Sequence, residues 1–152
     1  MSIDARLTDL NITLPDAPAP AANYVPFVRT GNLLFVSGQI SSGPDGLIRG
    51  RLGDDLDAAA GAAAARACGL ALLAQARAAL GSLDRVARVV KLTGFVASTA
   101  DFTDQPEVVN GCSDLMVEVF GDRGRHARAA VSAAALPRGV AVEVEAIFEI
   151  AP

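Results

Sequence analysis

The sequence is poor in reactive side chains. Its 152 residues include one His, one Lys, one Tyr and two Cys, and Trp is absent. A single His excludes a catalytic pair of histidines within the chain, and it excludes a metal cluster built from several His ligands. No glycine-rich phosphate loop is present, because Gly61 and Gly69 lie inside a predicted helix and do not follow a strand.

Charge and hydropathy exclude further classes of protein. The formal net charge of −4 and the scattered arginines argue against a nucleic-acid binder, which concentrates basic residues in a patch. A hydrophobic fraction of 51% excludes a disordered chain. The most apolar stretch, Ala58–Leu80, is rich in alanine and is interrupted by Arg66, Gln75 and Arg77, so we do not expect a membrane span.

Compartment and size follow from similar observations. The first ten residues carry charges where an export signal would need an apolar run, which predicts a cytoplasmic protein. Cys68 and Cys112 have neither CxxC nor zinc-finger spacing, so we interpret them as buried thiols in a reduced compartment. The length suits one domain over residues 1–152, with a helix and Pro-rich arm over 1–23 and a core over 24–152.

Hydrophobic periodicity and turn residues predict an α+β fold. The expected elements are a helix from Ser2 or Asp4 to about 10, strands 24–29 and 33–37, a helix from Asp54 or Asp55 to 80, a strand 86–97, a helix from Pro106 to 120, and strands 127–135 and 140–150. After the first helix the order is β-β-α-β-α-β-β. We expect the helices to cover one face of a single sheet.

Three finer patterns accompany these elements. The turn at 136–139 (LPRG) predicts a hairpin between the last two strands. One helical stripe should pack on the sheet, and it consists of Leu56, Ala60, Ala63, Ala67, Leu70 and Ala74. In the last strand, apolar residues alternate with Glu143, Glu145 and Glu149.

The candidates for chemistry are an arginine and a carboxylate. Arg128 lies in an otherwise apolar strand, where its planar guanidinium suits a bound carboxylate; equally, it could pair with a glutamate of this chain or of a neighbour. Glu143 and Glu145 fit either a solvated sheet face or a polar lining where subunits meet. His126 would have to serve any serine triad, but we interpret it as structural or surface-exposed, and as the group that titrates near neutrality if it borders a cleft.

Several of these segments together resemble the RidA (YjgF) family. The resemblance rests on Tyr24, the stretch GNLLFVSGQ at 31–39, Asn110, Arg128, the Leu-Pro pair at 136–137 and VEVEA at 142–146. It covers nearly the whole chain from Tyr24 onward, and its specificity lies in the spaced combination. The N-terminal helix, the Pro-rich arm and the string 121–126 are more similar to a less characterised branch of that family.

The resemblance implies a homotrimer with a chorismate-mutase-like α+β fold, a central core of sheets and ligand clefts between subunits. The implied activity is hydrolysis of 2-enamino and 2-imino acids to 2-keto acids and ammonia, without a metal or organic cofactor. A non-catalytic trimer that binds small carboxylates, with a regulatory or chaperone-like role, is the main alternative. The ribonuclease or translation-inhibitor activity associated with some relatives is a third, and the acidic charge and single His disfavour it.

The resemblance also implies roles for single residues. Arg128 would hold the substrate carboxylate and Glu143 would position or activate water, while Tyr24, Ser37, Gly38 and Asn110 would line the cleft. Ala130 stands where the well-known deaminases often have cysteine, so it would offer only its backbone, and the segment from Asn110 to Arg128 is one residue longer.

Each lining residue also has a structural interpretation. Tyr24 could be a strand aromatic, Ser37 and Gly38 a strand end, and Asn110 a cap or brace of its helix.

The predicted hairpin has a geometric consequence. A regular hairpin centred on 137–139 would place Glu143 opposite position 133, roughly 16 Å from Arg128 at ~3.3 Å per residue. One small substrate cannot contact both side chains over that distance. We therefore expect the Arg128 and Glu143 of any one cleft to come from different subunits. A structure with the two side chains of one chain within a few ångström would refute this expectation.

Overall fold

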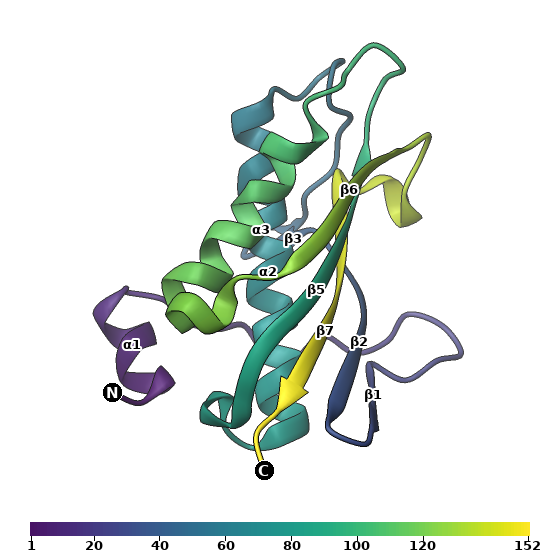
Figure 1. Ribbon diagram of the computed structural model, residues 1–152. Coiled ribbons are helices and arrows are strands. Elements are labelled where there is room, and N and C mark those ends of the chain that lie inside the picture. The colour runs from purple at the N-terminus through teal and green to yellow at the C-terminus, as the bar shows by residue number, and fades with distance from the viewer.

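The structure, a computed structural model, describes all 152 residues as two layers (Figure 1). Its helices are α1 (Ile3–Asp9), α2 (Ala58–Leu80) and α3 (Gln105–Phe120). Its strands are β1 (Phe27–Thr30), β2 (Leu33–Ile40), β3 (Ser42–Gly43), β4 (Gly46–Leu47), β5 (Val86–Ala97), β6 (Ala127–Ala133) and β7 (Val142–Ile150). Five strands form one sheet in the order β1-β2-β7-β5-β6, and α2 and α3 cover one face of it. The predicted order and the one-sided helix layer are confirmed, with the hairpin β3–β4 in addition.

Several predicted boundaries are wrong. β2 continues through Ser37 and Gly38 to Ile40, so these two residues are not a strand end, and β6 ends at Ala133 while β7 begins at Val142. The first strand begins at Phe27 rather than at residue 24, because Pro26 has no N–H to donate to a strand ladder. The long helix begins after Asp57, whose carboxylate accepts a hydrogen bond from Ala60 N at 2.8 Å and caps the helix. Asp55 instead closes the preceding turn, since it accepts from Arg51 N at 2.6 Å.

The predicted hairpin between the last two strands is also wrong. β6 pairs with β5 in parallel, and β7 pairs with β5 antiparallel, so β5 lies between them. Residues 134–141 cross the end of β5, where Ala97 N donates to Ala141 O at 2.9 Å. The LPRG turn, with Arg138 at φ 60° and Gly139 at φ 75°, therefore belongs to a crossover connection rather than to a tight hairpin.

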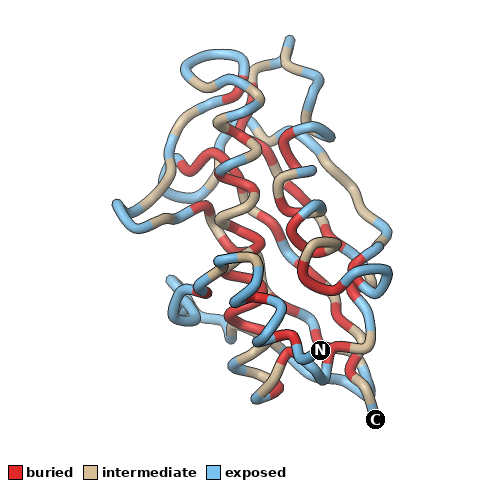
Figure 2. The backbone as a smooth tube through the Cα atoms, turned by 90° about the vertical axis from the view of Figure 1, so that its left-hand side faces the viewer, coloured by how far each residue is buried: buried red, intermediate tan, exposed pale blue.

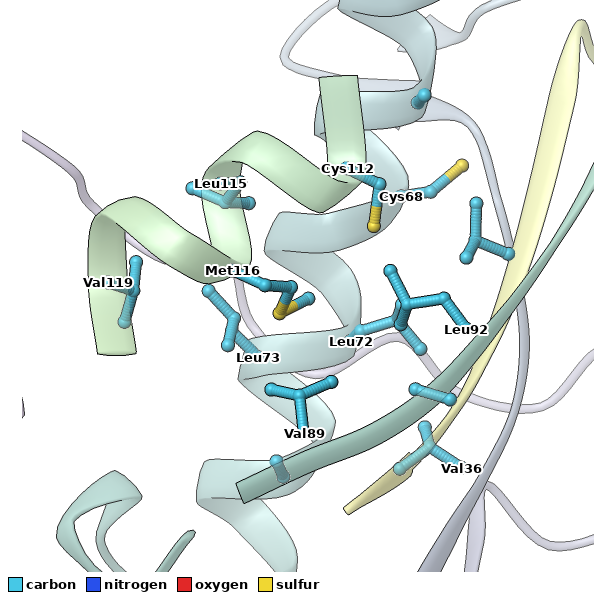
Figure 3. Close-up of a cluster of buried hydrophobic side chains, with 14 of the residues drawn as sticks. Val36, Cys68, Leu72, Leu73, Val89, Leu92, Cys112, Leu115, Met116 and Val119 are labelled. Carbon is cyan, nitrogen blue, oxygen red and sulfur yellow. The ribbon is translucent and has the colours of Figure 1, made fainter. Parts of the chain in front are cut away.

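The core lies between the sheet and the two long helices, as Figure 3 shows for a part of it. Val108, Cys112, Leu115 and Val119 form an apolar stripe at helical spacing on α3, and all four are buried. Cys68 and Cys112 are buried free thiols, as predicted, and burial raises the pKa of Cys112 to about 12. No three side chains of His, Cys, Asp or Glu gather where they could hold a metal ion.

The stripe predicted for α2 is wrong, and the error matters for the site. Of its six residues only Ala74 is buried, whereas the arc through Ala64, Cys68 and Leu72 is fully buried. The reason is that α2 packs against α3 as well as against the sheet. A side chain at Gly111 of α3 would collide with the backbone of Ala62, so glycine permits this close approach. The predicted stripe instead lies toward the more exposed side of α2. Figure 2 shows how buried and exposed positions alternate along the helices.

α2 is long and apolar enough, by length and composition alone, to cross a bilayer. In this fold, however, 56% of its most apolar window is buried inside the protein, as is usual for the central helix of a globular domain. The residues before β1 belong to the same body, since Ile3, Leu7 and Leu14 are part of the hydrophobic core cluster. From Leu14 onward the arm loops out beside β1 and β2 (Figure 1).

Candidate active site

The residues expected to form the site lie in two separate groups. Asn110, Arg128 and Ala130 belong to α3 and β6, at one edge of the sheet. Tyr24, Ser37, Gly38 and Glu143 instead line a cavity at β2 and β7 that contains none of the first group.

Arg128 is held by three groups of α3. Its Nη1 donates to Asn110 Oδ1 at 2.8 Å and to Ser113 Oγ at 3.1 Å. Its Nη2 donates to the backbone carbonyl of Pro106 at 3.0 Å. Because β6 pairs with β5 beneath the first turns of α3, the helix fixes a guanidinium that a strand alone would leave free. Asn110 therefore braces the arginine.

His126 and Ser113 extend this group, which we call the arginine cluster (Asn110, Ser113, His126 and Arg128). The Nδ1 of His126 lies 2.6 Å from Gly124 O, and its Nε2 lies 2.8 Å from Ser113 Oγ. A carbonyl only accepts, so Nδ1 carries the proton, and in the neutral ring Nε2 accepts from the serine hydroxyl. The lone pairs of Ser113 are then left for Arg128.

The environment favours the neutral ring that this arrangement requires. Partial burial lowers the pKa of His126, and the nearby positive charge of Arg128 lowers it further, against the opposing effect of the Gly124 hydrogen bond. The sequence interpretation treated His126 as structural and gave Ser113 no role. The available signal was spacing: Asn110 and Ser113 are i and i+3 on one helix face.

Arg128 keeps two donors unused by the chain. A guanidinium has five N–H donors, and the bonds to α3 use two on Nη1 and one on Nη2. The N–H of Nε and one N–H of Nη2 remain, and these two nitrogens share one edge of the group. No carboxylate of this chain forms an ion pair with Arg128, because the two ion pairs present are Arg66–Glu118 and Arg125–Asp122. The interpretation that Arg128 pairs with a glutamate of its own chain is therefore wrong.

Glu143 is the carboxylate of the second group. It alternates with the fully buried Val142 and Val144, so its side chain leaves the sheet on the face away from the helices. A side chain at Gly38 would collide with the Glu143 carboxylate, and glycine therefore leaves room for it. Burial, and to a smaller degree the charge of Glu145, raises the pKa of Glu143. The residue is half-buried, and its carboxylate forms no ion pair within the chain.

Tyr24 and Ser37 shape the wall near Glu143. Ser37 lies at a bulge of β2, where the pairing with β7 shifts between Val36 and Gln39. Its hydroxyl donates to Val25 O at 2.8 Å and ties the end of the arm to the strand. Tyr24 lies outside β1, so the interpretation of it as a strand aromatic is wrong. Its hydroxyl accepts from Ala21 N at 3.3 Å, and 47% of the residue is exposed.

The register of the sheet separates the two groups. Arg128 is paired with Leu92 of β5, and Glu143 is paired with Phe95 of the same strand. Two strand spacings and three residues correspond to about 14 Å between their backbones. The two side chains also leave opposite faces, since Arg128 bonds to α3. The separation predicted from a β6–β7 hairpin therefore rests on a pairing that does not exist. The observed register nevertheless keeps Arg128 and Glu143 of one chain too far apart to contact one small molecule.

Comparisons with known proteins identify the family of the chain. The family described as Endoribonuclease L-PSP matches residues 14–150. Protein TCP17 of Trypanosoma cruzi is 53% identical over 97% of this chain and 94% of its own length. The crystal structure of the protein Atu1372, of unknown function, from Agrobacterium tumefaciens has 49% identity and a TM-score of 0.90, over 97% of this chain and 92% of that one.

A protein named RidA also matches, with a shorter overlap. The crystal structure of RidA from the Antarctic bacterium Psychrobacter sp. PAMC 21119 has 30% identity and a TM-score of 0.62, over 89% of this chain and 94% of that one. The α+β architecture is thus the chorismate-mutase-like fold expected from the resemblance. By its family match and these relatives, the chain belongs to the L-PSP endoribonuclease family, in which RidA and YjgF are also found.

Proposed function

We propose that the protein is a homotrimeric, cofactor-independent deaminase that hydrolyses 2-imino and 2-enamino acids to 2-keto acids and ammonia. The observation that carries the proposal is the state of Arg128. Its guanidinium is fixed by α3, has no carboxylate partner in the chain and keeps Nε and one Nη2 donor free on one edge. That edge matches the two oxygens of a substrate carboxylate.

Hydrolysis of an imino acid requires an oriented substrate, a water molecule and a general base. An imine carbon is electrophilic, and a carboxylate held by two parallel hydrogen bonds fixes its position relative to water. The Glu143 carboxylate takes a proton from water while the oxygen bonds to the imine carbon and the C=N π electrons move to nitrogen. The protonated Glu143 gives this proton to the nitrogen, which produces a carbinolamine with OH and NH2 on the same carbon. Glu143 then takes the hydroxyl proton and passes it to the nitrogen, so the C–N bond breaks and ammonia leaves as the C=O bond forms. An enamine first takes a proton at carbon to become the imine.

The trimer is part of the proposal because one chain keeps Arg128 and Glu143 on opposite faces. The face of the sheet away from the helices is uncovered in the single chain (Figure 1) and carries exposed Val28, Phe35 and Val131. Exposed apolar side chains on an uncovered sheet face are typical of a subunit interface. Three such faces turned toward one another would bring the arginine cluster of one subunit to the Glu143 of the next.

The family description favours RNA cleavage as a second candidate. The acidic net charge of −4 disfavours it, since RNA binding relies on clustered basic residues. In the other alternative, a trimer that binds small carboxylates without turnover, Arg128 would bind the carboxylate in the same way.

One experiment distinguishes the deaminase, the carboxylate-binding trimer and the ribonuclease. An amino-acid oxidase generates the imino acids in situ, and ammonia release above the spontaneous rate is measured with the wild type and Arg128→Ala. Acceleration that disappears in Arg128→Ala supports the deaminase. No acceleration with any imino acid contradicts it. Binding of pyruvate by the same preparation then favours the binding trimer, and cleavage of a single-stranded RNA favours the ribonuclease.

A further inference from the structure

One apolar side of α2 is only partly covered by the rest of the core. Ala63 is exposed, Ala67 and Leu70 are half-buried, and Ala71 is buried at the edge of this side. On a helix that met water directly, these positions would carry polar residues. Small apolar residues at positions 63, 67 and 71, one helical turn apart, leave open space along the helix. This is the side of α2 that the sequence wrongly assigned to the sheet.

The N-terminal arm encloses that space. Leu14 anchors the start of the arm in the core cluster. In the middle, Gln75 Nε2 of α2 donates to Pro18 O at 2.6 Å, although Gln75 is almost completely buried. At the end, Ser37 binds Val25 O through its hydroxyl. Because these three contacts fix its start, middle and end, the arm has a defined position over the space.

The resulting cavity is large and continues to the proposed water-activating residue. It has a volume of about 1180 Å³, and most of its lining comes from the arm, α2 and β2, with apolar residues beside the charged Asp16, Arg66 and Arg138. It wraps around the part of β2 beyond Val36 that β1 leaves unpaired. Glu143 and Gly38 line it on the outer face of the sheet, and Ala67 and Leu70 line it on the helix side.

We propose that this cavity binds the side chain of the substrate, and that the protein therefore acts on 2-imino acids with large apolar side chains, such as aromatic and branched ones. The inference rests on the proposed function, since it names the substrate class of the same site. Pockets for drug-sized ligands measure roughly 300–1,000 Å³, so this cavity exceeds the need of a three-carbon acid. A large apolar side chain would displace water from the apolar part of its walls, which favours binding.

Eleven of the 29 residues that line the cavity belong to the N-terminal arm, at positions 13–26. The shape of the cavity therefore depends on the path of the arm.

The test fills the cavity without touching Arg128 or Glu143. Ala67→Phe places an aromatic ring in the space, and Ala63→Phe does so at the more exposed end if the first variant folds poorly. Ala78→Phe is the matched control, because Ala78 is exposed on the same helix and does not line the cavity. Each variant is assayed with imino acids derived from phenylalanine, leucine and alanine.

We expect the wild type to prefer the phenylalanine and leucine derivatives. A filled cavity should lower kcat/KM for these two by at least about tenfold, and change it for the alanine derivative by less than about twofold. The Ala78→Phe variant should match the wild type. Turnover of the alanine derivative alone by the wild type, or an equal loss on all three substrates, would refute the side-chain cavity while leaving the deaminase intact.

Two further measurements separate the remaining outcomes. Calorimetric titration with phenylpyruvate and pyruvate tests the cavity without chemistry: we expect Ala67→Phe to weaken the binding of phenylpyruvate alone. If no imino acid is turned over, the proposed function fails, and this titration still decides whether the cavity takes an apolar side chain. Light scattering reports the subunit number; loss of assembly in Ala67→Phe but not in Ala78→Phe would show that a neighbouring subunit fills the space and would overturn the inference.

Discussion

The two halves of the proposed site differ in how their polar groups are held. At the α3–β6 edge, Arg128 is tied by hydrogen bonds to Asn110, Ser113 and Pro106, and His126 in turn fixes Ser113. At the β2–β7 side, the Glu143 carboxylate forms no ion pair within the chain and lines the cavity. One half is a rigid polar cluster, and the other is a single carboxylate in an open, apolar place.

This difference fits a division of labour. A group that positions a substrate benefits from being fixed in advance, because the loss of its rotational freedom has already occurred on folding. A base benefits from partial burial, which raises the pKa of Glu143 and makes its carboxylate a stronger proton acceptor. The predictions below remove each half in turn.

Loss of Arg128 should have the largest effect. Arg128→Ala removes two charge-assisted hydrogen bonds to the substrate carboxylate, so we expect kcat/KM to fall about 100- to 1,000-fold. Steady-state kinetics with a saturable imino acid measure this effect. Arg125→Ala is the control, because Arg125 is an exposed arginine that pairs only with Asp122, and it should retain wild-type kinetics. Equal losses in the two variants would contradict a specific role for Arg128.

Loss of the base comes next. Glu143→Gln keeps the shape of the side chain, so kcat should fall about 100-fold with little change in KM. Its thermal stability at neutral pH should equal or exceed that of the wild type. Burial of the ionised Glu143 carboxylate destabilises the folded wild type, and the uncharged amide of Glu143→Gln does not have this cost. The cost also disappears at low pH, because the carboxyl group is then protonated in both the folded and the unfolded protein.

The control for this variant is Glu149→Gln, which changes another glutamate on the same face of β7. It should leave both kcat and KM at wild-type values. A Glu143→Gln variant that raised KM and kept kcat would instead make Glu143 a binding residue.

The bracing of Arg128 by Ser113 should give a smaller change. Ser113→Ala removes one hydrogen bond of about 1 kcal/mol, so KM should rise about fivefold with kcat kept. His126 offers a matched pair of substitutions. In His126→Gln the amide oxygen can still accept from Ser113, whereas in His126→Asn the amide nitrogen replaces Nδ1 and the acceptor is lost. We expect Gln to retain the wild-type KM and Asn to behave like Ser113→Ala; the reverse order would show that His126 acts only through Gly124.

The smallest effect concerns pH. Activity should fall as pH decreases through the pKa of Glu143, which lies above the ordinary glutamate value of 4.5. Glu145 contributes to that rise through its charge, so Glu145→Gln should move the acid limb of kcat/KM to lower pH without changing the plateau. If the acid limb of kcat/KM does not move in Glu145→Gln, the charge of Glu145 does not contribute to the raised pKa of Glu143.

The sequence predicted the element order well because alternation in β7 and the stripe of α3 report local burial. It failed where an outcome depends on partners far along the chain. The pairing of β6 with β5 rather than β7 is such a case, since a turn sequence does not reveal which strand lies between two others. The α2 stripe failed similarly, because alanine suits a contact with a sheet, a helix or a cavity equally.

For the site, the family resemblance supplied Arg128, Glu143 and Asn110, but not the roles of their neighbours. Ser113 and His126 lie near Asn110 and Arg128 in the sequence, but only the approach of α3 to β6 brings their hydrogen-bonding atoms to Arg128. The cavity could not be foreseen either, because it depends on the path of a Pro-rich arm whose anchor, Gln75, is one polar residue in an apolar helix.

The most direct test of the account is complementation between two inactive variants. Arg128→Ala and Glu143→Gln subunits are unfolded, mixed in equal amounts and refolded together, and ammonia release is compared with that of each variant alone. If each cleft takes Arg128 from one subunit and Glu143 from its neighbour, random mixing restores about a quarter of the wild-type clefts. If both residues of a cleft come from one subunit, every subunit lacks one of them, and the mixture stays as inactive as its parents.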